Sequence, residues 1–168
     1  MKGKAHVFGN DVNTDYIISG KYKFKTLDMK ELASHVMEDL DPEFASRVKP
    51  GDFIVAGRNF GCGSSREQAP LAILHAGVGA VLAKSFARIF YRNAINTGLP
   101  VVECDTDRIQ AGDELEVDLA QGRVTNLTQG VVLPVKPLPP VMLEILADGG
   151  LAEHLKRHGG FALARQSE

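Results

Sequence analysis

The chain has 168 residues, of which 44% are hydrophobic, so it is long enough for one domain with a substantial core and too short for two ordinary domains. Its formal net charge is −2, with 19 basic and 21 acidic residues spread along the chain. This balance excludes the strongly charged surfaces that bind nucleic acid or membranes. No apolar run approaches the roughly 20 residues that span a bilayer, and Met1–His6 lacks the apolar region of a secretion signal. We expect one cytoplasmic domain over residues 1–168.

The first two thirds of the chain show alternating strand and helix patterns. A short strand over residues 5–8 leads into a loop that extends to about Thr26, and a helix is predicted from Asp28, a favoured N-cap. A second short helix is predicted around residues 44–48. Strands are then expected at 52–56, 79–83 and 100–104, and helices at 66–76 and 86–95. This alternation is typical of a mainly parallel sheet flanked by helices.

The last third of the chain shows a different pattern of predicted elements. From Gly112 onward, short β segments are predicted at 115–119, 123–127 and 131–135, separated by turn residues. Prolines at 137, 139 and 140 then precede a last helical region with Met142, Ile145 and Leu146 on one face. The tail after Phe161 is expected to be disordered. The predicted fold class is therefore α/β, with additional short β segments in the C-terminal half.

Cysteine and histidine usage predicts no metal ligand in this chain. Cys62 and Cys104 are expected to be reduced thiols, because disulfides are rare in the cytoplasm. Two cysteines cannot hold an iron-sulfur cluster, which usually takes four, and they lack the spacing of a zinc site. The histidines share no catalytic spacing and receive no role: His6, His35, His75, His154 and His158.

The most informative stretch is Gly61–Glu67, with the sequence GCGSSRE, where a glycine-rich loop enters a predicted helix. Backbone N–H groups and the helix dipole at such a place favour a carboxylate or a developing oxyanion. Arg66 is suited to binding a carboxylate through two parallel hydrogen bonds. A simpler interpretation stays open, in which Ser65 caps the helix and Arg66 lies in solvent.

Three known loop motifs do not match this stretch. A P-loop needs Lys after its last glycine, whereas Ser64 follows Gly63. A dinucleotide fingerprint needs Gly or Ala where Arg66 stands, and the spacing of a nucleophile elbow is not formed around Ser64. The residues themselves predict an anion site with a reactive hydroxyl.

Three segments, in this order, resemble the small subunit of 3-isopropylmalate dehydratase in the aconitase superfamily. They are Asp11–Asp15 (DVNTD), Asn59–Glu67 (NFGCGSSRE) and Ser85–Ala94 (SFARIFYRNA), and the similarity extends over roughly residues 5–160. The resemblance implies a swivelling β/β/α domain, which in single-chain aconitases closes over the cluster-bearing domains. One departure is Gln68, because many members of the family have His at this position.

The resemblance also implies roles for particular residues. Ser64 would be the catalytic base of a hydro-lyase that isomerises 2-hydroxy acids by removing and re-adding water. Ser65 and Arg66 would bind substrate, and Asp15 would orient Arg66 or a residue of a partner. For Arg88 and Arg92 a surface or packing role is favoured over substrate contact. This chain would hold no cofactor, and a large partner subunit would carry a four-iron cluster and be required for activity; whether the isolated chain forms a homo-oligomer stays open.

The stretch with Phe24 and Lys25 resembles the specificity loop of the family, which implies that these two residues would decide substrate choice. Homoaconitase-like members have Arg where this chain has Phe24, and Phe24 offers no charge to a third carboxylate. Burying an isopropyl group gains about 0.8 kcal/mol per carbon, which favours 3-isopropylmalate and leucine biosynthesis. Three alternatives stay open: homoaconitase, a dehydratase of another alkylmalate such as dimethylmalate or citramalate, and a non-catalytic module that binds small carboxylates.

Overall fold

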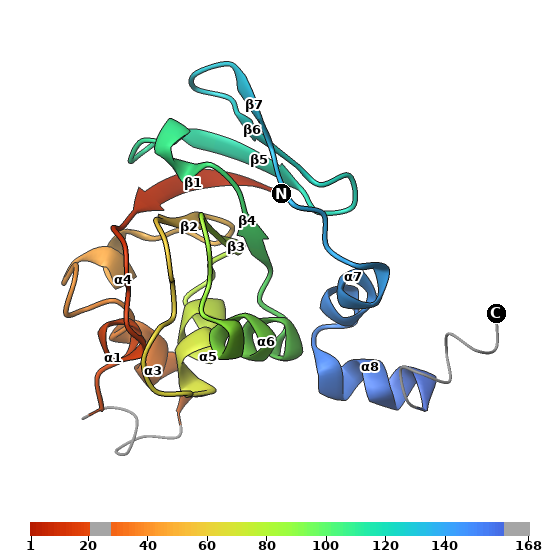
Figure 1. Cartoon of the computed structure of the whole chain (residues 1–168). Helices are drawn as coiled ribbons and strands as arrows, with labels where there is room; N and C mark the ends of the chain where they lie inside the picture. Colours follow the sequence, from red (N-terminus) through yellow and green to blue (C-terminus); the bar gives the residue numbers. More distant parts are fainter. Residues whose placement is uncertain (21–27, 160–168) are drawn as a thin grey trace.

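The computed structural model describes residues 1–20 and 28–159 (Figure 1). Phe24, Lys25 and the tail after Phe161 lie outside these ranges. In the described residues seven strands form one sheet: β1 (Lys2–Val7), β2 (Phe53–Ala56), β3 (Ala80–Ala83), β4 (Val101–Glu103), β5 (Glu114–Asp118), β6 (Arg123–Asn126) and β7 (Val131–Pro134). The helices are α1 (Thr14–Ile17), α3 (Met29–Ser34), α4 (Phe44–Arg47), α5 (Gln68–His75), α6 (Arg88–Thr97), α7 (Pro140–Ala147) and α8 (Leu151–His158), with a 3₁₀ turn at Thr106–Arg108.

The sheet has two halves that meet at β1. Its strand order is β4-β3-β2-β1-β5-β6-β7. Strands β1 to β4 pair in parallel, whereas β5, β6 and β7 add to the other edge of β1 as antiparallel neighbours. The α/β prediction is confirmed, and the predicted C-terminal β segments are strands of the same sheet. The sheet is therefore mixed, and its parallel character belongs to the N-terminal half.

Both faces of the parallel strands are buried, but against different partners. Ile54 and Val81 belong to a core shared with the helices, which lie together below the strands in Figure 1. Their neighbours Phe53 and Leu82 point to the opposite face and pack with residues of β5, β6 and β7. Successive side chains of a strand alternate between faces, so apolar residues throughout β2 and β3 supply both cores. The result is a β/β/α arrangement of layers.

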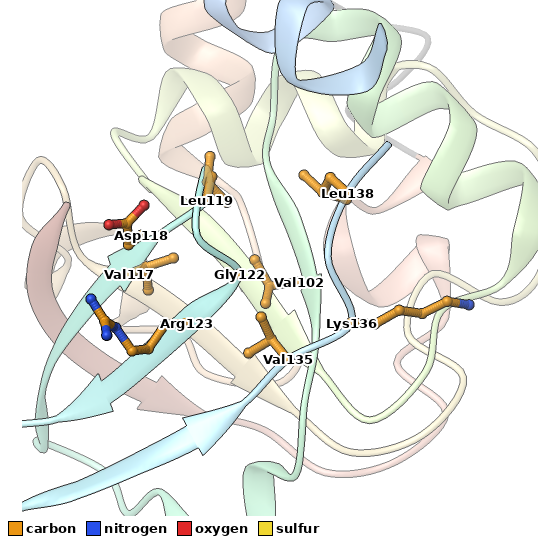
Figure 2. A pocket seen from close by; sticks show the side chains of 9 residues that line it. All are labelled: Val102, Val117, Asp118, Leu119, Gly122, Arg123, Val135, Lys136 and Leu138. Atoms are coloured by element: carbon orange, nitrogen blue, oxygen red, sulfur yellow. The ribbon is translucent and has the colours of Figure 1, made fainter. Parts of the chain in front are cut away.

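The sheet curls until its two edges approach each other. Cys104, just after β4, forms an antiparallel bridge with Val135, just after β7, and the backbone N–H of Lys136 donates to the carbonyl of Glu103. Figure 2 shows the small pocket beside this closure, walled by apolar side chains that include Val102 and Leu119. Its cavity volume is about 10 Å³, which is space for one water molecule at most. We interpret it as a packing gap.

The structure differs from the sequence predictions at two places in the N-terminal region. The loop predicted before residue 26 contains the short helix α1, whose first turn is capped by the Asn13 side chain. The helix from Asp28 has the predicted N-cap but ends at Ser34, before Met37, which has a φ of 59°. The N–H of Met37 donates to the carbonyl of Ile17 instead of continuing the helix. Among the helices of the described ranges, none is long and apolar enough to cross a bilayer.

A buried carboxylate connects β1 to the start of β2. Asp52, 6% exposed, accepts hydrogen bonds from the Nε2 of His6 at 2.9 Å and from the backbone N–H groups of Lys4 and Lys49, both at 3.0 Å. Burial acts to raise the pKa of Asp52, but the hydrogen bonds from His6 and the two amides outweigh it and lower the pKa below its ordinary value of 3.8. The ionised form is therefore favoured in the folded state.

Because the pKa of Asp52 is lower in the folded than in the unfolded chain, its stabilisation is present above about pH 4 and is lost as pH falls through the folded-state pKa. We expect Asp52→Asn to lower the free energy of unfolding by about 2 kcal/mol at pH 7 and to flatten the loss of stability below pH 4. Urea denaturation at several pH values measures both effects. The exposed Asp39→Asn is the control, and an equal effect of the two substitutions would contradict the role of Asp52.

Candidate active site

The three segments singled out in the sequence meet at one edge of the sheet. Asp11–Asp15 follows β1, Asn59–Glu67 follows β2, and Ser85–Ala94 follows β3. These strands are parallel neighbours, so their carboxyl ends lie side by side. Ligands of α/β proteins commonly bind at this edge. The fold therefore brings together residues that are up to about 80 positions apart in the chain.

Backbone hydrogen bonds hold the glycine-rich loop between the other two segments. On one side, the N–H of Gly61 donates to the carbonyl of Val12, and the N–H of Thr14 donates to the carbonyl of Cys62, both at 2.8 Å. On the other side, Phe60 donates to the carbonyl of Ser85 at 3.1 Å and accepts from the N–H of Ala87 at 2.9 Å. The loop is therefore a fixed part of the site.

Two glycines are required by this close approach. Gly61 has a φ of 84° and Gly63 a φ of 95°, a region that residues with a side chain rarely adopt. A Cβ on Gly61 would collide with the ring of Phe90, and a Cβ on Gly63 would lie 2.5 Å from the Oδ1 of Asn13. Neither position accepts a larger residue without movement of its neighbours.

A cavity of about 220 Å³ opens at the loop. Ser64, Ser65 and Arg66 line it, as the sequence predicted. Asp15 does not, although its neighbour Thr14 does. Arg88 also lines the cavity, whereas Arg92, one turn further along α6, does not. The full lining is Thr14, Gly61, Gly63, Ser64, Ser65, Arg66, Ala87, Arg88, Ile89, Phe90 and Asn93.

Side chains from the two flanking segments position the serines. The Oγ1 of Thr14 donates to the backbone carbonyl of Ser64 at 2.9 Å, and the Nδ2 of Asn93 donates to the Oγ of Ser65 at 3.4 Å. Thr14 and Asn93 were given no role from the sequence. Each lies in a matched segment, but no spacing rule predicts contacts across 28 or 50 residues.

The interpretation of Ser65 as a helix cap is wrong. Helix α5 begins at Gln68, and its N-cap is Glu67, whose side chain makes no capping hydrogen bond. Ser64 and Ser65 precede the helix and are exposed, whereas Arg66 is half-buried. The serine hydroxyls are thus open to the cavity instead of satisfying the helix end.

The charge of the cavity suits an anion. Among the described residues that line it, Arg66 and Arg88 are cationic and none is a carboxylate. Cys62 lies in the same loop but outside the lining, and burial together with the nearby Asp11 carboxylate raises the pKa of its thiol. A raised pKa keeps the thiol protonated at neutral pH, which makes Cys62 a poor nucleophile. The reactive groups that line the cavity are therefore the serine hydroxyls and the guanidinium groups of Arg66 and Arg88.

Comparison with known proteins agrees with this geometry. The family model described as Aconitase C-terminal domain matches residues 12–106, which include the glycine-rich loop, the segment Ser85–Ala94 and all of Asp11–Asp15 except Asp11. The chain belongs to the aconitase C-terminal domain family.

Within this family, the similar proteins include small subunits of 3-isopropylmalate dehydratases and of a homoaconitase. The chain is 62% identical over 159 residues to the 3-isopropylmalate dehydratase small subunit 2 of Archaeoglobus fulgidus, covering 95% of this chain and 96% of that protein. It is 58% identical to the methanogen homoaconitase small subunit of Methanothermobacter thermautotrophicus, covering 92% and 89% respectively. The predicted resemblance is therefore confirmed.

A solved structure of the family has the same fold. The crystal structure of 3-isopropylmalate dehydratase from Methanocaldococcus jannaschii superposes with a TM-score of 0.91 at 48% sequence identity. The match covers 99% of this chain and 98% of that chain. The mixed sheet and its flanking helices are thus those of an aconitase C-terminal domain.

The packing of Phe90 against Gly61 provides a test of the loop geometry. We expect Gly61→Ala to lower the free energy of unfolding by about 2–4 kcal/mol, because the substitution combines an unfavourable positive φ with a collision. Thermal or urea unfolding measures the change. Gly9→Ala is the matched control, since a Cβ there meets nothing within 4 Å. A loss below about 0.5 kcal/mol for Gly61→Ala would show that the loop accepts a side chain.

Proposed function

We propose that this chain is the small subunit of a 3-isopropylmalate dehydratase, a hydro-lyase that isomerises 2-hydroxy acids by dehydration and rehydration. The observation that supports this most directly is the cavity at the carboxyl ends of β1, β2 and β3, where Ser64 and Ser65 lie beside Arg66 and Arg88 with no lining carboxylate among the described residues. A substrate of this class carries carboxylates and must lose a proton from a carbon next to one of them. The cavity offers a hydroxyl and cations for these two tasks.

Ser64 is proposed as the base. Its alkoxide would take the proton from carbon during dehydration, and the hydroxyl formed in this way would return a proton during rehydration. A serine hydroxyl is a very weak acid, so its anion requires strong stabilisation by nearby N–H donors and positive charge. The arginines of the cavity supply the charge, and Gly61 and Gly63 let backbone groups approach closely.

Arg66 and Ser65 are proposed to bind a substrate carboxylate. The guanidinium group is planar and matches a carboxylate with two hydrogen bonds. The hydrogen bond from Asn93 orients the Ser65 hydroxyl. Asp15, which lies outside the cavity lining, keeps its proposed role of orienting Arg66 or a residue of a partner.

A partner must supply the metal chemistry of this reaction. The cysteines of this chain do not fit an iron-sulfur cluster, because Cys62 lies in the loop after β2 and Cys104 is buried in the core between the sheet halves. We therefore assign a four-iron cluster to a large subunit, consistent with the small-subunit names of the relatives. When bound there, such a cluster supplies a Lewis acid for the substrate hydroxyl.

The proposal is tested by reconstitution. The purified chain is assayed anaerobically with and without its large subunit on a panel of 2-hydroxy acids. We expect turnover only for the mixture. Turnover by the isolated chain would contradict the proposal, and stable monomeric binding of small carboxylates without any partner would support the carboxylate-binding module instead.

In the reconstituted complex, we expect Ser64→Ala to lower kcat by at least about 100-fold with little change in KM, because a positioned base acts in the transition state. Ser46→Ala, on the exposed helix α4, is the control. Steady-state kinetics measures both, and size-exclusion chromatography verifies assembly. A near-normal kcat for Ser64→Ala in an assembled complex would show that Ser64 is not the base.

Arg66→Lys tests the carboxylate contact separately. A single ammonium cannot reproduce two parallel hydrogen bonds, so we expect KM to rise by about tenfold or more with a smaller effect on kcat. Arg92→Lys is the matched control, because Arg92 lies on α6 but outside the cavity. Equal KM values for the two variants would show that Arg66 does not bind substrate.

Substrate choice is assigned to Phe24 and Lys25, which lie outside the described residues. The relatives do not decide which substrate is used, because the chain is 62% identical to a 3-isopropylmalate dehydratase subunit and 58% identical to a homoaconitase subunit. We favour 3-isopropylmalate, because an unpaired carboxylate next to an aromatic ring costs several kcal/mol by desolvation. Homoaconitase is the second candidate, supported by the methanogen relative.

We expect Phe24→Arg to shift the ratio of kcat/KM toward homoaconitate, by about tenfold or more, when both substrates are assayed with the same large subunit. Lys25→Ala measures whether the neighbouring cation contributes. If the ratio of kcat/KM for the two substrates is unchanged in Phe24→Arg, this segment does not select the substrate.

A further inference from the structure

We infer a binding site for a divalent transition-metal ion at the junction of α7 and α8, formed by Asp148, His154 and His158. One oxygen of Asp148, Oδ2, lies 2.8 Å from the Nδ1 of His154 and 3.1 Å from the Nε2 of His158. The three ligand atoms lie within 4.8 Å of one another. A zinc ion bonded to nitrogen and oxygen at about 2.0–2.2 Å holds its ligand atoms roughly 3.0–3.4 Å apart. The two distances to Oδ2 are close to this range, and the two imidazole nitrogens, within 4.8 Å of each other, would approach on binding the ion.

The backbone places these ligands on a fixed scaffold. His154 and His158 are one turn apart on α8, so they lie on the same face of the helix. Asp148 is the C-cap of α7, and Gly149 and Gly150, with φ of 90° and 123°, reverse the chain between them. A Cβ on Gly150 would lie 2.8 Å from the carbonyl oxygen of Asn96, so this turn is pressed against the end of α6.

The three proposed ligands differ in burial, so the site is closed at His154 and open at His158. The side chain of His154 is 0% exposed and that of Asp148 is 13% exposed, whereas His158 is 35% exposed. The buried imidazole cannot swing away, which keeps the entropic cost of binding low. The exposed edge at His158 admits the ion and leaves room for water as a further ligand.

Arg157 holds the second oxygen of the Asp148 carboxylate. The guanidinium of Arg157 lies 3.3 Å from the other oxygen, Oδ1. Oδ2 is therefore left facing both imidazoles, and Arg157 takes the place of an outer partner that orients a ligating carboxylate.

A purely structural role explains less of this arrangement. Fastening α8 to α7 requires one hydrogen bond to Asp148, yet two imidazoles converge on the same oxygen while Arg157 occupies the second. Two imidazole nitrogens with one carboxylate form a ligand set suited to Zn²⁺ and unsuited to Mg²⁺, which prefers oxygen ligands. The ion would stabilise the packing of α8 on α6 and α7, away from the proposed chemistry.

Zn²⁺ titration of the full chain, prepared without a polyhistidine tag and treated with a chelator, tests this inference. We expect one equivalent to bind by calorimetry and, at about 100 times its Kd, to raise the Tm by about 5–10 °C. Mg²⁺ should have no effect. The absence of Zn²⁺ binding, or binding without a rise in Tm, would overturn the site.

Variants assign the binding to these residues. His158→Gln and Asp148→Asn should each weaken Zn²⁺ binding by at least about 100-fold, and Arg157→Gln by about tenfold, as expected for an outer partner. His75→Gln and Cys62→Ser, at an exposed histidine and at the more accessible thiol, should leave the affinity unchanged. Undiminished binding in both His158→Gln and Asp148→Asn, or its loss in Cys62→Ser, would place the ion elsewhere. Dehydratase activity does not enter this test, so its outcome is independent of the proposed function.

Discussion

The parallel pairing of β1, β2 and β3 is the constraint on which the rest of the molecule depends. Parallel neighbours end at the same edge of a sheet, so the segments that follow these strands are forced together. The glycine-rich loop then forms hydrogen bonds on both sides, donating to the carbonyls of Val12 and Ser85 and accepting from the N–H groups of Thr14 and Ala87. The cavity exists because three connections converge, and none of them forms it separately.

This pairing is stabilised from both faces. The helices bury one set of strand residues, and the antiparallel strands curl over the other set. Asp52 adds a polar connection between β1 and β2 by accepting three hydrogen bonds. Apolar burial fixes the layers without fixing direction, whereas these directional contacts help specify how the two strands align.

The site presents its chemistry outward. Ser64, Ser65 and Arg88 are exposed at the cavity, and the proposed reaction would need its carbanion to be shielded from bulk water. A second protein surface that covers the cavity would meet this requirement, which agrees with a division of the enzyme into two subunits. The inferred metal site lies at the other end of α6, where α7 and α8 pack, and so belongs to the scaffold of the domain.

The sequence by itself determined the α/β class, the alternation of the first elements and the N-cap at Asp28, because local spacing and loop chemistry act over a few residues. It also singled out Ser64, Ser65 and Arg66, which the fold places at one cavity. It did not determine that the C-terminal strands join the same sheet, that the N–H of Met37 bonds to Ile17, or that Thr14 and Asn93 contact the serines. It also gave no role to His154 and His158, whose meaning appears only when a glycine turn brings Asp148 against them. Contacts between distant residues depend on strand order and on the direction of each turn, and the tertiary structure alone decides these.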